Sequence, residues 1–594
     1  MKQFHVTRAS RDKYQFDEIL FSKNGNVIFA NFQASREFAH KINQLRVDPE
    51  NPESYVSPAD INALGLLDEI FHQIMDSYYS THGRKIQIAL ARYLIGTLGR
   101  DVVIKTLTDY NDQFPPTEIY QGKKTIAAYL KEIDQGITNY DVTVEEMLMT
   151  WLTNINPAAV RYREIFDDRP LYSSSAYAKL LDGVQTFFKT QPVFGPENQD
   201  LVTMLRTPSL RFPDSLTGQL EYIRQNWSQY LSEFFLRLLG GLDMLAEEAK
   251  ARAMFFAAGQ DFSKAETHVP VYRRGFDAWG EPLEEIENFS PDSDWMPRVV
   301  MLAKNVFVWL NQLSRQYQRP IETLDQIPDE TLDQLVNWGF TGLWLIGLWE
   351  RSDASREIKQ RCGNPDAVSS AYSLSRYQIA QRLGGEGAYY NLSQRCGARG
   401  IRLASDMVPN HMGIDSDWVY DHPDWFIQSD HSPFPAYTFE GPDLSKRPGF
   451  SINLEDHYYS RSDAAVVFKT YDHNSGRTRF IYHGNDGTSM PWNDTAQLNY
   501  LNPEVREAVI QTILAVARRF PIIRFDAAMT LTKKHYQRLW FPQPGSGGDI
   551  PSRADHAMTK EAFDRAMPEE FWREVVDRVA AEVPDTLCWQ KPSG

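Results

Sequence analysis

The chain has 594 residues, of which 42% are hydrophobic and 13% aromatic, so it can bury a large core and should form more than one domain. Its formal net charge of −16 disfavours nucleic acid or a membrane as a partner and suits a protein that handles neutral substrates. Three cysteines without CxxC or metal-type spacing exclude a disulfide framework and favour a reducing compartment. No apolar signal segment and no 18-residue apolar run occurs, so the sequence predicts a cytoplasmic protein.

Residues 1–290 are predicted to form a mostly helical N-terminal domain. Ser57-Pro-Ala-Asp60 is typical of a helix start with proline at the first helical position, and apolar residues follow at helical spacing. The pair Gly240-Gly241 is expected to interrupt the last helix, which resumes at 242–256. No catalytic pattern occurs in this half, and turn formers at 258–295 predict a linker. Further helices are expected at 84–98, 143–152, 173–189 and 216–239.

Beyond the linker, short apolar runs alternate with helical patterns, which predicts an α/β fold with a parallel sheet or barrel. Residues 412–500 are too long for an ordinary connection and are expected to form a small inserted domain after the third strand. The predicted architecture for 295–594 is an incomplete (β/α)8 TIM barrel with about its first four to five strands. The expected strands are 306–310, 341–346, 401–407, 521–526 and a fifth that starts at 585–588, and the expected helices begin at Pro328, Glu386, Asn502 and 569.

Polar residues follow the third and fourth of these strands. Asp406, Asn410 and His411 end one strand and Arg524 and Asp526 end the other, at the mouth where α/β barrels collect catalytic groups. Arg524 and Asp526 are two residues apart on a strand and share a face. A guanidinium beside a carboxylate keeps it ionised, as a nucleophile requires, although the residues alone leave open a purely structural ion pair.

These two pieces also carry a resemblance to a known family. Asp406-Met-Val-Pro-Asn410-His411 resembles the first conserved region of glycoside hydrolase family 13, the α-amylase family, and Arg524-Phe-Asp526 resembles the second. The lead-in at 338–345 and the segment 493–509 are similar to the family as well. By this resemblance, residues 295–590 are identified as a member of that family, whereas the helical half has no part in the similarity.

The resemblance implies an enzyme that acts on α-glucans or maltooligosaccharides by a retaining double displacement. Asp526 would be the nucleophile, Arg524 would hold it charged, and Asp406 would support Arg524. His411 would bond hydroxyls of the sugar at the cleavage point, and Tyr372 would stack on that sugar, although its sequence context departs from the family pattern. No cofactor is required. Asn410 matches a position that often ligates a structural calcium ion in the family.

The family places its acid/base glutamate at the end of the fifth barrel strand, and this sequence ends at Gly594 before such a residue. We therefore expect the N-terminal part of a longer enzyme, truncated or frameshifted near Leu587 and inactive as a glycosidase. If the codons for residues 588–594 are read one base earlier, they can encode Leu-Ala-Glu-Ala-Phe-Trp. This is the sequence expected for a fifth strand that ends in the catalytic glutamate. A short protein completed by an unknown partner chain is the alternative.

Three classes of function remain open from the sequence. The first is an α-glucan hydrolase or transglycosylase, between which the residues do not discriminate. The second is a non-catalytic α-glucan-binding protein that retains half of the site. The third is an unrelated α/β barrel enzyme, which predicts loss of activity on chelation of metal.

Overall fold

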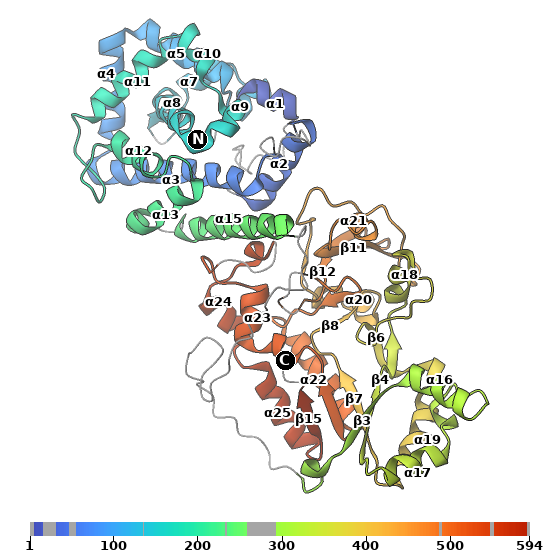
Figure 1. Ribbon diagram of the computed structural model, residues 1–594. Helices are drawn as coiled ribbons and strands as arrows, with labels where there is room; N and C mark the ends of the chain where they lie inside the picture. Colours follow the sequence, from blue (N-terminus) through green and yellow to red (C-terminus); the bar gives the residue numbers. More distant parts are fainter. Residues whose placement is uncertain are drawn as a thin grey trace. The chain divides into compact units, whose positions relative to one another are not determined.

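The computed structural model describes residues 5–15, 31–46, 55–134, 136–231, 234–257, 293–485, 487, 490–546 and 552–590. The chain forms two compact units (Figure 1). The first comprises Met1–Met254, Phe434–Ala436 and Pro544–Ala557, and the second comprises Phe255–Pro433, Tyr437–Gln543 and Met558–Gly594. The predicted linker falls almost entirely outside the described residues, which resume at position 293. Within those described ranges, no helix is both long and apolar enough to cross a membrane.

The first unit is helical, as predicted from the apolar periodicity. Helix α3 (Pro58–His82) begins at the expected cap, where the Ser57 side chain accepts a hydrogen bond from the Asp60 backbone N–H. The carboxylate of Asp60 accepts a hydrogen bond from the Tyr162 hydroxyl. The longer helices around α3 are α2 (Phe32–Arg46), α4 (Lys85–Leu98), α5 (Arg100–Gln113), α8 (Asn139–Ile155), α11 (Tyr177–Phe188), α12 (Leu201–Arg211), α13 (Leu216–Asn226) and α15 (Phe234–Ala257).

The predicted break at Gly240-Gly241 is wrong, because α15 runs through both glycines. A Cβ atom on Gly241 would lie 2.2 Å from Cδ1 of Leu66 on α3, and one on Gly240 would lie 3.2 Å from the ring of Phe32 on α2. The two glycines therefore permit close helix packing. A tertiary contact, invisible in the local sequence, outweighs the low helix propensity of glycine.

A network of charged groups is buried in the centre of this unit. Nε2 of His5 lies 2.7 Å from Glu146 on α8, and Nε2 of His72 on α3 lies 3.2 Å from both oxygens of the same carboxylate. Nδ1 of His72 also lies 3.3 Å from the carboxylate of Asp68. Burial opposes charge on both groups, but the imidazoles hold the pKa of Glu146 well below its usual range, and the carboxylates hold the pKa of His72 well above its own.

The second unit is built on a five-stranded parallel sheet in the order β15-β14-β7-β4-β3 (Figure 1). Each strand lies beside its predecessor in this series, as expected for successive β/α units of a barrel. The predicted parallel β/α arrangement and the helical N-terminal half are thus confirmed. The strands are β3 (Met301–Asn305), β4 (Gly342–Ile346), β7 (Arg402–Met407), β14 (Ile522–Phe525) and β15 (Leu587–Gln590).

The first predicted strand, 306–310, is wrong. Strand β3 ends at Asn305, whose side chain accepts a hydrogen bond from the Val308 N–H and begins helix α16 (Val306–Gln316). Val306, Trp309 and Leu310 are buried on one side of this helix, whereas Val308 is 54% exposed. The prediction is wrong because a short apolar run does not distinguish helix from strand. The other connecting helices are α17 (Asp329–Asn337), α18 (Asp353–Arg361), α19 (Gly385–Gly397), α22 (Pro503–Ala517), α23 (Lys533–Trp540), α24 (Lys560–Ala566) and α25 (Phe571–Glu582).

The long segment between β7 and α22 holds strands of its own. Strands β10 (Phe450–Leu454), β11 (Val467–Asp472), β12 (Arg477–Tyr482) and β9 (Gln428–Ser429) form an antiparallel sheet. Strands β8 (His411–Gly413) and β13 (Thr495–Gln497) pair where the segment leaves and rejoins the barrel strands. The predicted domain boundaries at 1–290, 295–594 and 412–500 stay predictions.

Candidate active site

The site forms where β7 and β14 lie side by side. Arg524 on β14 is in register with Asp406 on β7, and its Nη1 donates to Oδ1 of Asp406 at 3.2 Å. The same nitrogen lies 2.6 Å from Oδ1 of Asp526, one residue beyond the end of β14. The parallel pairing therefore gathers two carboxylates around one guanidinium, as the sequence spacing predicts.

The backbone after β14 fixes the position of Asp526. Its N–H donates to the Met407 carbonyl at 2.8 Å, so Asp526 remains tied to the neighbouring strand. The next residue, Ala527, has a φ of 53°, in the left-handed region that non-glycine residues rarely adopt. Such strain is tolerated where surrounding contacts enforce it, and it is common at functional sites. The Asp526 side chain retains 22% of its exposure, so a ligand can reach it.

Asp406 supports Arg524 from a buried position. Trp344 on β4 donates its indole N–H to Oδ2 of Asp406 at 3.1 Å, and Trp349 donates to the Asp406 backbone carbonyl at 2.8 Å. Burial raises the pKa of Asp406 to about 6, against the opposing effect of the Arg524 charge. The Arg524 guanidinium also lies 5.6 Å from the Trp344 ring and 5.5 Å from the Tyr372 ring, in cation–π range.

We predict that kcat/KM decreases as the pH falls through about 6, because protonation of Asp406 removes one of the two carboxylate charges that hold Arg524. The folded state binds this proton more tightly than the unfolded chain, whose carboxyl titrates near 3.8, so the contribution of Asp406 to stability decreases as the pH rises between these values. Activity and this stability contribution thus change in opposite directions. Profiles of kcat/KM against pH for the wild type and Asp406→Asn test this: the acidic limb should disappear in the variant, and an unchanged limb would contradict the assignment.

His411 and Tyr372 meet beside Asp526. Nε2 of His411 lies 3.2 Å from the Tyr372 carbonyl oxygen, and the His411 ring lies 5.0 Å from the Trp492 ring. Asp526, Tyr372, His411 and Trp492 all line a cavity of about 440 Å³. That volume is within the range of small-molecule sites. The structure therefore brings together five of the sequence-predicted residues, Asp406, Arg524, Asp526, His411 and Tyr372.

Asn410 has different surroundings. It is fully buried, and its Oδ1 accepts hydrogen bonds from Nε2 of Gln497 and from the Thr530 hydroxyl, both at 3.0 Å. Calcium prefers six to eight oxygen ligands, usually with carboxylates among them. Here N–H and O–H donors occupy the amide oxygen, and the described residues contain no cluster of three or more acidic, histidine or cysteine side chains suited to a metal. These residues do not fit a calcium site.

We therefore expect chelation to leave the protein unchanged. Melting temperature and binding of maltotriose should be the same after dialysis against EDTA as in excess calcium, because neutral hydrogen bonds satisfy Asn410. A melting temperature that falls with EDTA and recovers with calcium would restore the predicted metal role of Asn410. The same experiment tests the alternative of an unrelated metal-dependent barrel enzyme.

Several residues at the site are absent from the sequence-based prediction. Trp344 belongs to the lead-in segment that resembles the family, so a signal was present, but only the structure shows its bond to Asp406. Trp492, Asp494 and Lys359 line the cavity from distant parts of the chain. Asp494 belongs to the segment 493–509, which also resembles the family, whereas no local pattern singles out Trp492 or Lys359. The predictions about an acid/base glutamate and about the chain end stay predictions.

The site is a guanidinium–carboxylate pair at the strand ends of a parallel β/α sheet, and it opens into an aromatic-lined cavity. This combination defines a barrel-type protein with a small-molecule site. Residues 323–588 match the family model described as the catalytic domain of alpha amylase. This part of the chain belongs to the α-amylase family.

Individual proteins match at low identity. Maltase A1 of Drosophila melanogaster is 23% identical over 264 residues, which are 43% of this chain and 41% of the relative, so the chain spans about two fifths of that relative's length. An alpha-amylase from Lactobacillus plantarum is 16% identical, with 50% of this chain and 46% of that chain covered and a TM-score of 0.28. The trehalose-6-phosphate hydrolase of Bacillus licheniformis is 16% identical, with 50% and 45% covered and a TM-score of 0.31.

Proposed function

We propose that this protein carries the nucleophile site of an enzyme that cleaves α-glucosidic bonds in uncharged α-glucans through a covalent glycosyl intermediate on Asp526. The observation that carries the proposal is the Asp526 carboxylate, which is paired with Arg524 at 2.6 Å at the end of β14 and exposed to the cavity. The family match over residues 323–588 and the name of the Drosophila relative, Maltase A1, support the same chemistry.

The reaction assigns one role to each residue. An oxygen of Asp526 attacks the anomeric carbon, the bond from that carbon to the leaving oxygen breaks, and water later releases the sugar with the original anomeric configuration. Arg524 pairs with the attacking carboxylate at 2.6 Å, and Asp406 orients Arg524. His411 and Tyr372 bind the sugar ring from the cavity wall. The second carboxyl group of such a reaction, which protonates the leaving oxygen, is not assigned to a described residue.

Glycosyl fluorides test this proposal, because fluoride leaves without a proton from a second carboxyl group. We expect the chain to release fluoride from α-D-glucosyl fluoride and not from the β-anomer. Fluoride release from the β-anomer alone would overturn the proposed substrate class. Binding of maltotriose without any fluoride release would instead indicate a non-catalytic α-glucan-binding protein, and larger oligosaccharide products would indicate a transglycosylase.

A further inference from the structure

The cavity extends from Asp526 to a wall that the proposed chemistry does not use. Helix α18 contributes Ser355 and Lys359 to this wall, and the segment before β13 contributes Trp492 and Asp494. Ser355 and Lys359 are four residues apart on the helix and so share one face. The wall therefore has a defined structural basis and belongs to the same unit as Asp526.

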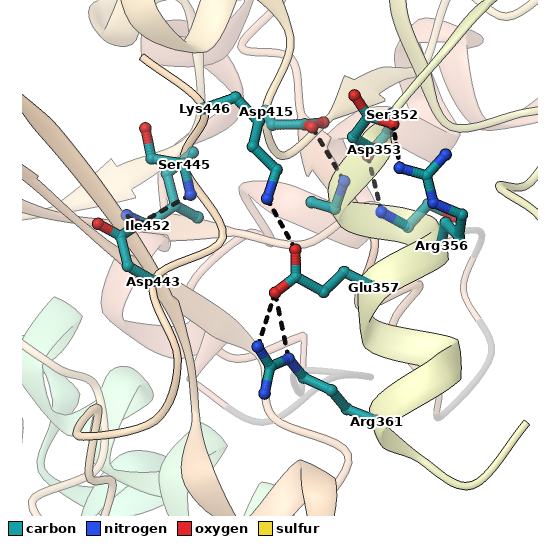
Figure 2. A network of polar contacts seen from close by, with 12 residues as sticks. Ser352, Asp353, Arg356, Glu357, Arg361, Asp415, Asp443, Ser445, Lys446 and Ile452 are labelled. Carbon is teal, nitrogen blue, oxygen red and sulfur yellow. Dashed lines mark hydrogen bonds and ion pairs between the residues drawn. The ribbon is translucent and has the colours of Figure 1, made fainter. Parts of the chain in front are cut away.

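The opposite face of α18 is held by charged contacts (Figure 2). The carboxylate of Glu357 accepts hydrogen bonds from Lys446 and from Arg361, both at 2.8 Å. At the start of the helix, Oδ2 of Asp415 accepts a hydrogen bond from the Ala354 N–H at 3.0 Å, and the Ser352 hydroxyl caps the first turn. The contacts from Lys446 and Asp415 connect the helix to other segments of the same unit, so the residues on its other face have defined positions. The Glu357–Arg361 pair and the Ser352 cap are local to the helix.

Asp494 contacts several polar residues around this wall. Its Oδ2 accepts a hydrogen bond from the Ser355 hydroxyl at 2.5 Å and lies 3.9 Å from Nζ of Lys359. Its backbone carbonyl accepts a hydrogen bond from the Ser373 hydroxyl at 2.7 Å. The Lys359 side chain is 41% exposed and the Asp494 side chain 17% exposed, so the ammonium can also reach a ligand. A long ion pair of this exposure contributes little to stability.

A sugar ring suits this arrangement. The ammonium of Lys359 offers three donors and the carboxylate of Asp494 only acceptors, and adjacent sugar hydroxyls can both donate and accept. Trp492, next to His411, adds a flat apolar face. The charges of Lys359 and Asp494 cancel. The pair therefore offers no uncompensated positive charge that would bind an anionic substituent.

We propose that Lys359 and Asp494 form a second sugar subsite, which binds the ring next to the one at Asp526 and favours uncharged oligosaccharides over phosphorylated ones. This inference rests on the proposed function and adds its substrate selectivity. Lys359 and Asp494 act here as specificity-determining residues and take no part in the bond-breaking step.

The test measures binding by calorimetry with the full chain, with maltotriose and maltose 6′-phosphate as probes. Lys359→Met should weaken maltotriose binding about tenfold, the scale of one lost charged hydrogen bond. Asp494→Asn keeps an acceptor for Ser355 but frees the lysine charge, so it should increase binding of the phosphorylated sugar. Lys560→Met, which removes the lysine of an exposed Lys–Asp pair on α24, is the matched control and should change neither.

The rate of labelling by a single-ring reagent, 5-fluoro-α-D-glucosyl fluoride, distinguishes failure of the second subsite from failure of the proposed function. It should be unchanged in Lys359→Met, which also shows that the variant is folded. Unchanged maltotriose affinity in folded Lys359→Met would overturn the second subsite while the proposed function stands. A wild type that neither binds maltotriose nor is labelled would overturn both.

Discussion

Replacement of Asp526 by Asn is expected to lower the rate of fluoride release from α-D-glucosyl fluoride by a factor on the order of 10³ or more, as removal of a nucleophile does in other enzymes. The amide preserves the shape of the side chain but cannot form a covalent bond to the anomeric carbon. It also removes the negative charge that pairs with Arg524 at 2.6 Å. Initial rates at saturating substrate measure the effect.

Asp430→Asn provides the control, because the Asp430 side chain is 83% exposed and lies outside the cavity lining. Its rate should match that of the wild type. Circular dichroism and the melting temperature should be similar for both variants, since the amide of Asn keeps the size and shape of the Asp526 side chain. An Asp526→Asn rate within tenfold of the wild type would exclude Asp526 as the nucleophile.

The second large effect is expected in the helical unit. Glu146→Gln should lower the local free energy of unfolding by about 3–5 kcal/mol, the cost of breaking a buried charged network by removing one partner. His5 and His72 would then lose the carboxylate that compensates their burial. Hydrogen exchange of amides in α3 and α8 measures this locally, which suits a chain with two units.

The pH dependence of the same network has a definite sign. The pKa of Glu146 is depressed, so its contribution to stability is lost as the pH falls through that lowered value. The pKa of His72 is raised, so its contribution is lost as the pH rises through the raised value. Exchange protection should therefore be greatest between these limits in the wild type and less dependent on pH in Glu146→Gln. Glu118→Gln, on an exposed ion pair, should change protection by less than about 1 kcal/mol, and equal effects of the two variants would contradict the buried network.

Much of the barrel unit follows from local sequence. The cap at Asn502 and the apolar face of α22 are confirmed, as are the short apolar strands β7 and β14. These features depend on hydrogen bonds and burial within a few residues, so a single sequence contains them. The meeting of Arg524 with Asp406 was predictable too, because parallel pairing aligns the ends of neighbouring strands.

The errors and omissions have a different physical origin. Residues 306–310 form a helix because Asn305 caps it, although the same apolar run fits a strand. Gly240 and Gly241 remain helical because other helices pack against them. Lys359 and Asp494 meet only after the segment between β7 and α22 has folded, so no spacing in the sequence relates them. A local cap decided the first of these cases, and contacts between distant segments decided the other two.

The most direct test of the central claim is covalent trapping with 5-fluoro-α-D-glucosyl fluoride, followed by peptide mass spectrometry. The reagent needs no acid for its leaving group, so it reports on the nucleophile alone. We expect a single fluoroglucosyl adduct on Asp526 in the wild type and none in Asp526→Ala. An adduct on another carboxylate, or no adduct in a folded protein that binds maltotriose, would contradict it.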